Sequence, residues 1–137
     1  YNNIELNLHD LDKTVYTDSK WCIFILNQII QNSIKYSKKE DKKIEIYSEE
    51  KKDSVILWVK DNGIGIKEKD ISRVFEKGFT GEKGRLIGKK STGIGLYLCK
   101  KLCDKLDFGI KLYSKEGEGT VVKITFPVNS MTEMWEL

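Results

Sequence analysis

The stretch WVKDNGIGI, residues 58–66, connects an apolar strand pattern to a turn that contains two glycines. Asp61 stands where the strand pattern ends, and Gly63 and Gly65 allow positive φ angles and a close approach of the backbone. An ionised aspartate only accepts hydrogen bonds, so Asp61 could bind an exocyclic amine such as that of adenine. The pattern predicts the floor of a site for a flat ligand, although a plain Asn-Gly turn also explains it.

The segments on either side alternate between strand and helix patterns. Residues 44–48 and 54–60 alternate apolar and polar side chains around a charged turn, which predicts a hairpin. The other predicted strands are residues 4–8, expected to be half-buried, and residues 109–113 and 120–126. Residues 15–16 are predicted to be a short extended piece. The predicted helices run from Thr17 or Asp18 to about Ser37 and from about Thr92 to Lys105.

These elements predict the fold class. The hairpins exclude a purely parallel sheet, and the helices between strands must cover the sheet. We therefore expect an α/β (α+β) fold, a two-layer sandwich of a mixed five-stranded sheet with about three helices on one face. The length of 137 residues favours a single domain, residues 1–137.

The composition excludes several functional classes. Apolar residues make up 39% and charged residues 33%, a balance typical of a globular domain with a core. The net charge is +3, and the lysine pairs at 38–39 and 42–43 are mixed with acidic residues, so no nucleic-acid groove is predicted. Three cysteines without scaffold spacing favour free thiols in a reducing cytosol. Cys99 and Cys103 are spaced for one helix face, and core packing explains them better than a metal site.

The ends of the chain suggest a longer protein. The longest apolar run, residues 21–26, is too short to cross a membrane, and the sequence opens without a methionine. We expect the chain to be a piece of a longer protein whose membrane or sensory segments lie elsewhere.

The first predicted helix carries a polar stripe. Gln28, Asn32, Lys35 and Tyr36 are spaced at i, i+4, i+7 and i+8, so they share one face. An amide oxygen suits a hard cation and a lysine suits phosphate, so the stripe could hold a magnesium triphosphate. A solvated face of an amphipathic helix explains the same spacing.

Two further glycine turns stand beside predicted elements. Residues 91–96, STGIGL, open the second helix, where free N–H groups form an anion site. A Ser or Thr cap with tightly packed glycines is the alternative. Residues 117–120, GEGT, precede the last strand and by themselves indicate only a hairpin turn.

The combination of these motifs resembles a known family. In chain order they are Asn32-x-x-Lys35-Tyr36, Asp61-x-Gly63-x-Gly65, Phe75 with Phe79, Gly93-x-Gly95 and Gly117-x-Gly119-Thr120. They resemble the N, G1, F, G2 and G3 boxes of the histidine-kinase ATPase family over roughly residues 14–127. That family also includes the ATPase domains of type II topoisomerases, Hsp90 chaperones and MutL-type repair proteins. A narrower resemblance is to sensor kinases of the bacitracin-resistance type, which work beside ABC transporters. The segments that carry it are residues 21–37 and 75–81, with Arg85 and residues 91–93.

The resemblance implies a role for each matching residue. Asn32 would bind Mg²⁺, and Lys35 and Tyr36 would approach the phosphates and ribose of ATP. Asp61 would bond the adenine amine, assisted by Thr120. Gly63 and Gly65 would surround the base, with Ile66 and Leu96 as its walls. The phosphates would lie at Thr92, Gly93 and Gly95. A lid over about residues 76–91 would bring Lys77 and Arg85 near the γ-phosphate.

One position departs from the hydrolytic members of the family. They carry a glutamate general base four residues before the magnesium asparagine, and here that position is Gln28. We therefore expect very slow ATP hydrolysis and, instead, phosphoryl transfer to a histidine. His9 lacks the helical context of a phosphoacceptor and is expected to be a surface residue.

The resemblance also implies partners and a location. The expected cofactors are ATP and Mg²⁺. The expected partners are the protein's own dimerisation domain with its phosphoacceptor, a response regulator and, through the full-length protein, an ABC transporter. We expect a monomeric cytoplasmic domain of a protein anchored in the bacterial cell membrane. The alternatives are an ATP-hydrolysing switch of the chaperone or repair kind, a serine-kinase anti-sigma factor, and a degenerate domain that binds a partner without catalysis.

Overall fold

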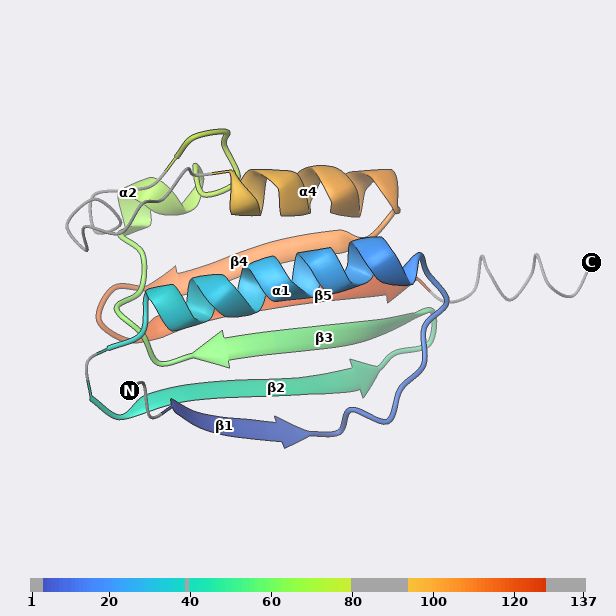
Figure 1. Cartoon of the computed structure of the whole chain (residues 1–137), viewed down its shortest axis with the longest axis horizontal. Coiled ribbons are helices and arrows are strands. Elements are labelled where there is room, and N and C mark those ends of the chain that lie inside the picture. Colours follow the sequence, from blue (N-terminus) through green and yellow to red (C-terminus); the bar gives the residue numbers. More distant parts are fainter. Residues whose placement is uncertain (1–3, 39, 80–93, 128–137) are drawn as a thin grey trace, which may run out of the picture.

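The computed structural model describes residues 4–38, 40–79 and 94–127, which form a mixed sheet covered by helices. The sheet has five strands in the order β1-β2-β3-β5-β4 (Figure 1). β1 pairs with β2 in parallel, and the other neighbours are antiparallel. The strands are β1 (Ile4–His9), β2 (Lys42–Glu50), β3 (Ser54–Asp61), β4 (Gly109–Lys115) and β5 (Gly119–Pro127). The predicted two-layer fold with a mixed five-stranded sheet is confirmed.

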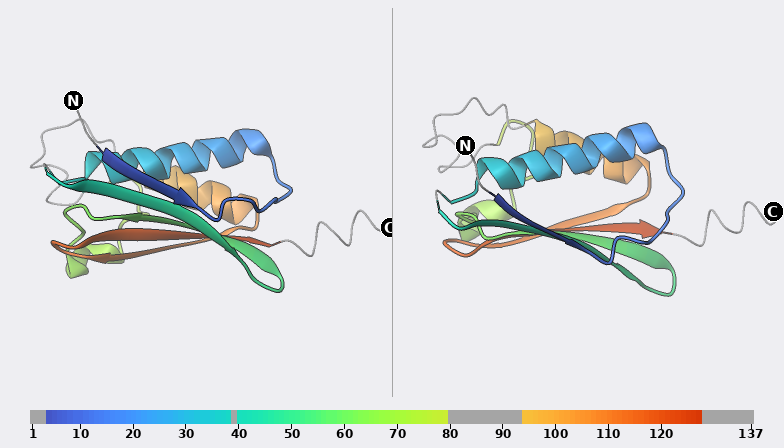
Figure 2. Two further views of the ribbon diagram at one scale, coloured as in Figure 1. Left: turned by 90° about the horizontal axis from the view of Figure 1, so that it is seen from below. Right: turned by 60° about the horizontal axis from the view of Figure 1, so that its bottom comes forward.

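Two long helices form the second layer. α1 (Ser19–Lys35) and α4 (Gly95–Lys105) lie side by side over one face of the sheet, and the short α2 (Glu68–Ile71) lies near the β4 edge (Figures 1 and 2). The core between the layers contains Ile25 and Ile29 of α1 and Ile124 of β5, none more than 1% exposed. Burying such side chains is the main stabilising contribution to the fold, about 1.5–3 kcal/mol each.

The cysteines belong to this core. Cys99 and Cys103 of α4 have no exposed surface, and burial raises their pKa values to about 12 and about 11. Neutral thiols in an apolar layer behave as small hydrophobic side chains. The prediction that they pack in the core is confirmed.

Local chemistry explains where α1 begins. The Asp18 side chain accepts hydrogen bonds from the backbone N–H groups of Lys20 and Trp21, at 3.1 and 3.4 Å, so Asp18 and not Thr17 caps α1. α4 begins at Gly95, with Ile94 as its N-cap residue and no side-chain hydrogen bond at that cap. Residues 92 and 93 lie outside the described residues. No helix in the described ranges is long and apolar enough to cross a membrane.

One sequence-based prediction near the first strand is wrong. β1 was expected to be half-buried, yet Leu6 and Leu8 are 56% and 53% exposed. The reason is position: β1 is the edge strand, beyond the part of the sheet that the helices cover (Figure 1). Residues 15–16, predicted to be a short extended piece, belong to no strand of the sheet.

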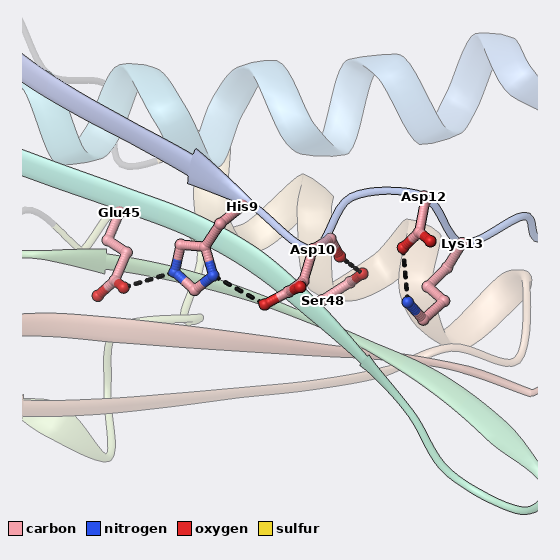
Figure 3. Close-up of polar contacts among 6 residues, drawn as sticks. All are labelled: His9, Asp10, Asp12, Lys13, Glu45 and Ser48. Carbon is pink, nitrogen blue, oxygen red and sulfur yellow. Dashed lines mark hydrogen bonds and ion pairs between the residues drawn. The ribbon is translucent and has the colours of Figure 1, made fainter.

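His9 links the edge strand to its neighbour. Its Nε2 lies 2.7 Å from Glu45 Oε2 of β2, and its Nδ1 lies 3.0 Å from Asp10 Oδ2 (Figure 3). The ring stacks on Tyr47 with centroids 4.8 Å apart. Hydrogen bonds to Asp10 and then to Glu45 raise the pKa of His9, because both carboxylates favour the doubly protonated ring. His9 is partly exposed, and its role in the structure is to hold β1 on β2.

Substitution of His9 by glutamine is expected to weaken the fold only at low pH. A raised pKa means that protonated His9 contributes stability that is fully present below its ordinary value of 6.5 and is lost as pH rises through the raised value. Urea unfolding of the two proteins across this range should therefore show a difference in unfolding free energy on the acid side that disappears on the alkaline side. A difference that does not vary with pH would contradict this role.

Candidate functional site

The ends of several elements meet at one end of the molecule. The C-terminal ends of β3, β4 and α1 lie there, and α4 begins on the same side, with its first turn against the middle of α1 (Figure 1). Asp61 is the last residue of β3, where it pairs with Ile44 of β2 and Thr120 of β5. The register therefore places the acid beside the start of β5, far from it in the sequence.

The Asp61 carboxylate is buried and held by the chain. Only 8% of the residue is exposed. Its Oδ1 accepts hydrogen bonds from the backbone N–H groups of Gly63 at 2.9 Å and Thr120 at 3.2 Å. Burial raises the pKa of Asp61, and the hydrogen bonds from the Gly63 and Thr120 N–H groups oppose that rise. The site is thus a desolvated acceptor with fixed orientation.

Glycines make room around this carboxylate. A Cβ on Gly63 would overlap the Tyr36 carbonyl oxygen, and one on Gly119 would overlap the Asp61 carbonyl oxygen. Gly65, at φ +72°, lies against the Lys115 carbonyl in the same way. Only glycine permits this close approach of three backbone segments.

Ser114 of β4 joins the turn after β3 to β5. Its Oγ accepts from the Ile66 N–H at 2.8 Å, lies 2.8 Å from the Thr120 hydroxyl and donates to the Gly119 carbonyl at 2.9 Å. Ile66 and Thr120, which were singled out separately, are therefore parts of one hydrogen-bonded network. Ser114 was missed because a lone serine in a strand carries no signal until the pairing of β4 with β5 is known.

The C-terminal end of α1 contacts the turn after β3. The Ile64 N–H donates to the Tyr36 carbonyl at 2.9 Å, which fixes the turn after β3 on the helix end. Lys35 Nζ lies 5.2 Å from the centroid of the Tyr36 ring. Asn32 is half-buried, one turn before Tyr36. The helix thus brings an amide, a cation and a phenol to the end of the sheet that carries Asp61.

The first turn of α4 lies against the middle of α1. A Cβ on Gly95 would come 2.6 Å from Gln28 Oε1. Leu96 is partly buried and packs against the core. Lys77 is exposed, with its Nζ 6.0 Å from the Tyr97 ring centroid, so it lies beside the start of α4.

The family model described as histidine kinase-, DNA gyrase B-, and HSP90-like ATPase matches residues 17–130. The chain belongs to this ATPase family. The sensor histidine kinase YxdK of Bacillus subtilis (strain 168) is 42% identical over 122 residues, 89% of this chain and 37% of that protein. The sensor protein kinase GraS of Staphylococcus aureus (strain JH1) is 42% identical over 120 residues, 88% of this chain and 34% of that protein.

A solved structure agrees with this ATPase fold. The catalytic domain of the histidine kinase ThkA is 27% identical, with a TM-score of 0.75 over 91% of this chain and 80% of that chain. The predicted resemblance to sensor histidine kinases is confirmed, and the domain is of the histidine kinase catalytic type. The chain spans about a third of the length of its curated relatives, so it corresponds to one part of such a protein.

The boxes of the ATPase family converge in part. The N, G1 and G3 boxes meet around Asp61, through Tyr36, Gly63 and Thr120. Arg85, Thr92, Gly93 and most of the expected lid lie outside the described residues.

Proposed function

We propose that this domain binds Mg-ATP around Asp61 and donates the γ-phosphoryl group to a histidine on the dimerisation domain of a two-component sensor kinase, for relay to a response regulator. The observation that carries the proposal is the buried Asp61 carboxylate, held by two backbone N–H groups beside a glycine turn. Such an acceptor suits the exocyclic amine of adenine, which offers a donor in the plane of a flat base.

The residues near Asp61 supply the remaining roles. Gly63, Gly65 and Ile66 would line the base, with Leu96 on the opposite side and Thr120 next to the acid. Lys35 and Tyr36 would approach the ribose and phosphates. Thr92, Gly93 and Gly95 would receive the phosphates, and Lys77 and Arg85 would reach the γ-phosphate from a lid over about residues 76–91. Transfer then depends mainly on positioning and charge neutralisation.

Magnesium fits this donor set. The ion usually keeps several waters and takes one or two protein oxygens together with substrate phosphates. The Asn32 amide oxygen at the helix end is such a ligand, and the described ranges hold no cluster of acidic, His or Cys side chains that would form an all-protein site. Bound Mg²⁺ would neutralise phosphate charge during transfer.

Several features of the whole protein belong to the same proposal. The domain would be the cytoplasmic part of a membrane-anchored sensor, with residues 1–137 acting as one ATP-binding unit. Its own dimerisation domain would present the phosphoacceptor, and an ABC transporter would be a partner of the full-length protein.

Replacing Gln28 with glutamate is expected to raise steady ATP hydrolysis about a hundredfold, because a carboxylate can act as general base for water where an amide cannot. Gln28 faces Gly95 at the start of α4, where the helix dipole favours a negative charge, so the variant should fold. Phosphate release should be compared with that of Gln31→Glu, the same change on the exposed side of α1. Equal rates for the two variants would contradict the role of this position.

Phosphoryl transfer is tested by incubating the chain with Mg-ATP labelled in the γ-phosphate and with dimerisation helices that carry a phosphoacceptor histidine. The proposal expects label on the helices in an acid-labile and base-stable form. Acid-stable label on a serine would favour the anti-sigma alternative, and release of free phosphate alone would favour a hydrolytic switch. Binding of ATP without either product would favour a degenerate domain.

A further inference from the structure

The Ser114 hydroxyl of β4 joins three segments of the chain beside Asp61. Its Oγ lies 2.8 Å from the Ile66 backbone nitrogen, 2.9 Å from the Gly119 carbonyl oxygen and 2.8 Å from Thr120 Oγ1. Thr120 also donates its backbone N–H to Asp61 Oδ1, at 3.2 Å. The network therefore runs from the turn after β3, through Ser114, to the residue that bonds the carboxylate proposed to bind adenine.

The chemistry of the partners fixes the direction of each of these bonds. A serine hydroxyl has one hydrogen to donate and two lone pairs that accept. The Gly119 carbonyl can only accept, so it receives the Ser114 hydrogen, and the Ile66 N–H can only donate, so it occupies one lone pair. The other lone pair is left for Thr120, whose hydroxyl is therefore the donor in the bond between the two side chains.

The Thr120 hydroxyl consequently has no hydrogen left for a ligand. Its single hydrogen is directed at Ser114, and only oxygen lone pairs remain for other groups. The neighbouring Asp61 carboxylate, when ionised, also only accepts. Two side chains next to the proposed base site, both 8% exposed, thus accept hydrogen bonds and do not donate them.

We propose that Ser114 is a positioning residue: it directs the Thr120 hydroxyl so that Thr120 and Asp61 both accept from the 6-amino group of adenine and disfavour a 6-carbonyl group. This inference rests on the proposed binding of ATP at Asp61. A 6-amino group has two hydrogens, one for each acceptor, with Thr120 reached directly or through one water. A 6-oxo purine would instead place its carbonyl oxygen against two acceptors. Ser114 therefore contributes to the choice of base without touching the nucleotide.

Backbone contacts hold the same segments together, so the fold does not depend on the Ser114 hydroxyl. The Gly117 N–H donates to the Ile64 carbonyl at 2.8 Å, which joins the turn between β4 and β5 to the turn after β3. β4 also pairs with β5 through its backbone up to the strand end. A Ser114→Ala variant should therefore keep this arrangement, while the Thr120 hydroxyl loses the acceptor that directs its hydrogen.

The test is the ratio of the affinities for Mg-ATP and for the magnesium complex of inosine triphosphate, measured by calorimetry. Inosine triphosphate has the same ribose and phosphates but carries a 6-carbonyl group. We expect the preference for ATP to fall about tenfold in Ser114→Ala, because the Thr120 hydroxyl becomes free to donate to the carbonyl. A purely structural effect would weaken the binding of both nucleotides equally and leave the ratio unchanged.

Two further variants complete the test. Ser48→Ala is the matched control: Ser48 is 8% exposed, its hydroxyl donates to the Asp10 carbonyl, and it pairs with Leu57 further back along β3. Its ratio should equal that of the unaltered chain. Thr120→Val removes the hydroxyl but keeps the backbone N–H that bonds Asp61. It should lower the preference by a similar factor, and adding Ser114→Ala to it should change the ratio no further.

The outcomes separate this inference from the proposed function. If the unaltered chain binds ATP but Ser114→Ala or Thr120→Val leaves the ratio unchanged, the positioning role is overturned and the proposed function stands. A further change of the ratio when Ser114→Ala is added to Thr120→Val would also overturn it, because Ser114 would then act by another route. If the unaltered chain binds no adenine nucleotide, the proposed function fails, and the inference fails with it.

Discussion

Replacement of Asp61 with asparagine is expected to weaken ATP binding at least about a hundredfold while the chain stays folded. Asparagine keeps an Oδ1 atom that can accept from the Gly63 and Thr120 N–H groups, so the local backbone structure should persist. Its NH₂ group, however, is a donor that would face the donor amine of adenine. Calorimetric titration of both proteins with Mg-ATP checks this, and equal affinities would overturn the assignment of Asp61.

The stability of the same variant gives an independent check. Burial raises the pKa of Asp61 in the folded chain above its pKa in the unfolded chain. The protonated acid therefore contributes stability that is present below the unfolded-state pKa and is lost as pH rises through the folded-state pKa. Ionised Asp61 therefore destabilises the nucleotide-free chain at neutral pH. The unfolding free energy of the Asp61→Asn variant should be at least as large as that of the unaltered chain at this pH. A binding residue that costs stability is typical of a functional site. Marked destabilisation of Asp61→Asn at neutral pH would point to a structural role.

The second large effect is expected for Gly119→Ala. Gly119 has φ +130°, and an added Cβ would overlap the main-chain carbonyl of Asp61 and lie 3.0 Å from Asn62 Cα. Both are backbone atoms at the end of β3, which is paired on both sides, so they cannot move aside cheaply. We expect a loss of about 3 kcal/mol in unfolding free energy, together with weaker nucleotide binding because Asp61 is displaced.

Gly117→Ala is the matched control for this substitution. Gly117 lies in the same turn with φ +83°, but an added Cβ would meet no atom within 4 Å. The remaining cost is that of placing an alanine at a positive φ angle, about 1 kcal/mol of unfolding free energy. Urea unfolding of the two variants therefore separates steric overlap from backbone preference. Similar losses for both would contradict the account of Gly119.

Much of this architecture could be predicted because its signals are local. The alternation over residues 44–48 and 54–60 indicated the hairpin, and the end of that alternation placed Asp61 at a strand terminus. The glycines were visible as turn residues at fixed spacing. That Gly63 and Gly119 both lie against Asp61 depends on the pairing of β3 with β5, which a single sequence does not specify.

The parts that were missed depend on partners far away in the chain. Ser114 stands in a strand where one serine looks like a tolerated small residue, and its bond from the Ile66 N–H exists only once β4 lies beside the turn after β3. α2, Glu68–Ile71, is a single turn and too short to show a helical period. The exposure of β1 follows from its place at the sheet edge, which strand alternation does not reveal.

The central claim is that the Asp61 carboxylate recognises the 6-amino group of adenine. It is tested most directly by titrating the chain with Mg-ATP and with purine riboside triphosphate, which has the same ring and phosphates but no 6-amino group. We predict that loss of the amine weakens binding at least about a hundredfold, because a buried carboxylate is left without its donor. Equal affinity for the two triphosphates would contradict the account.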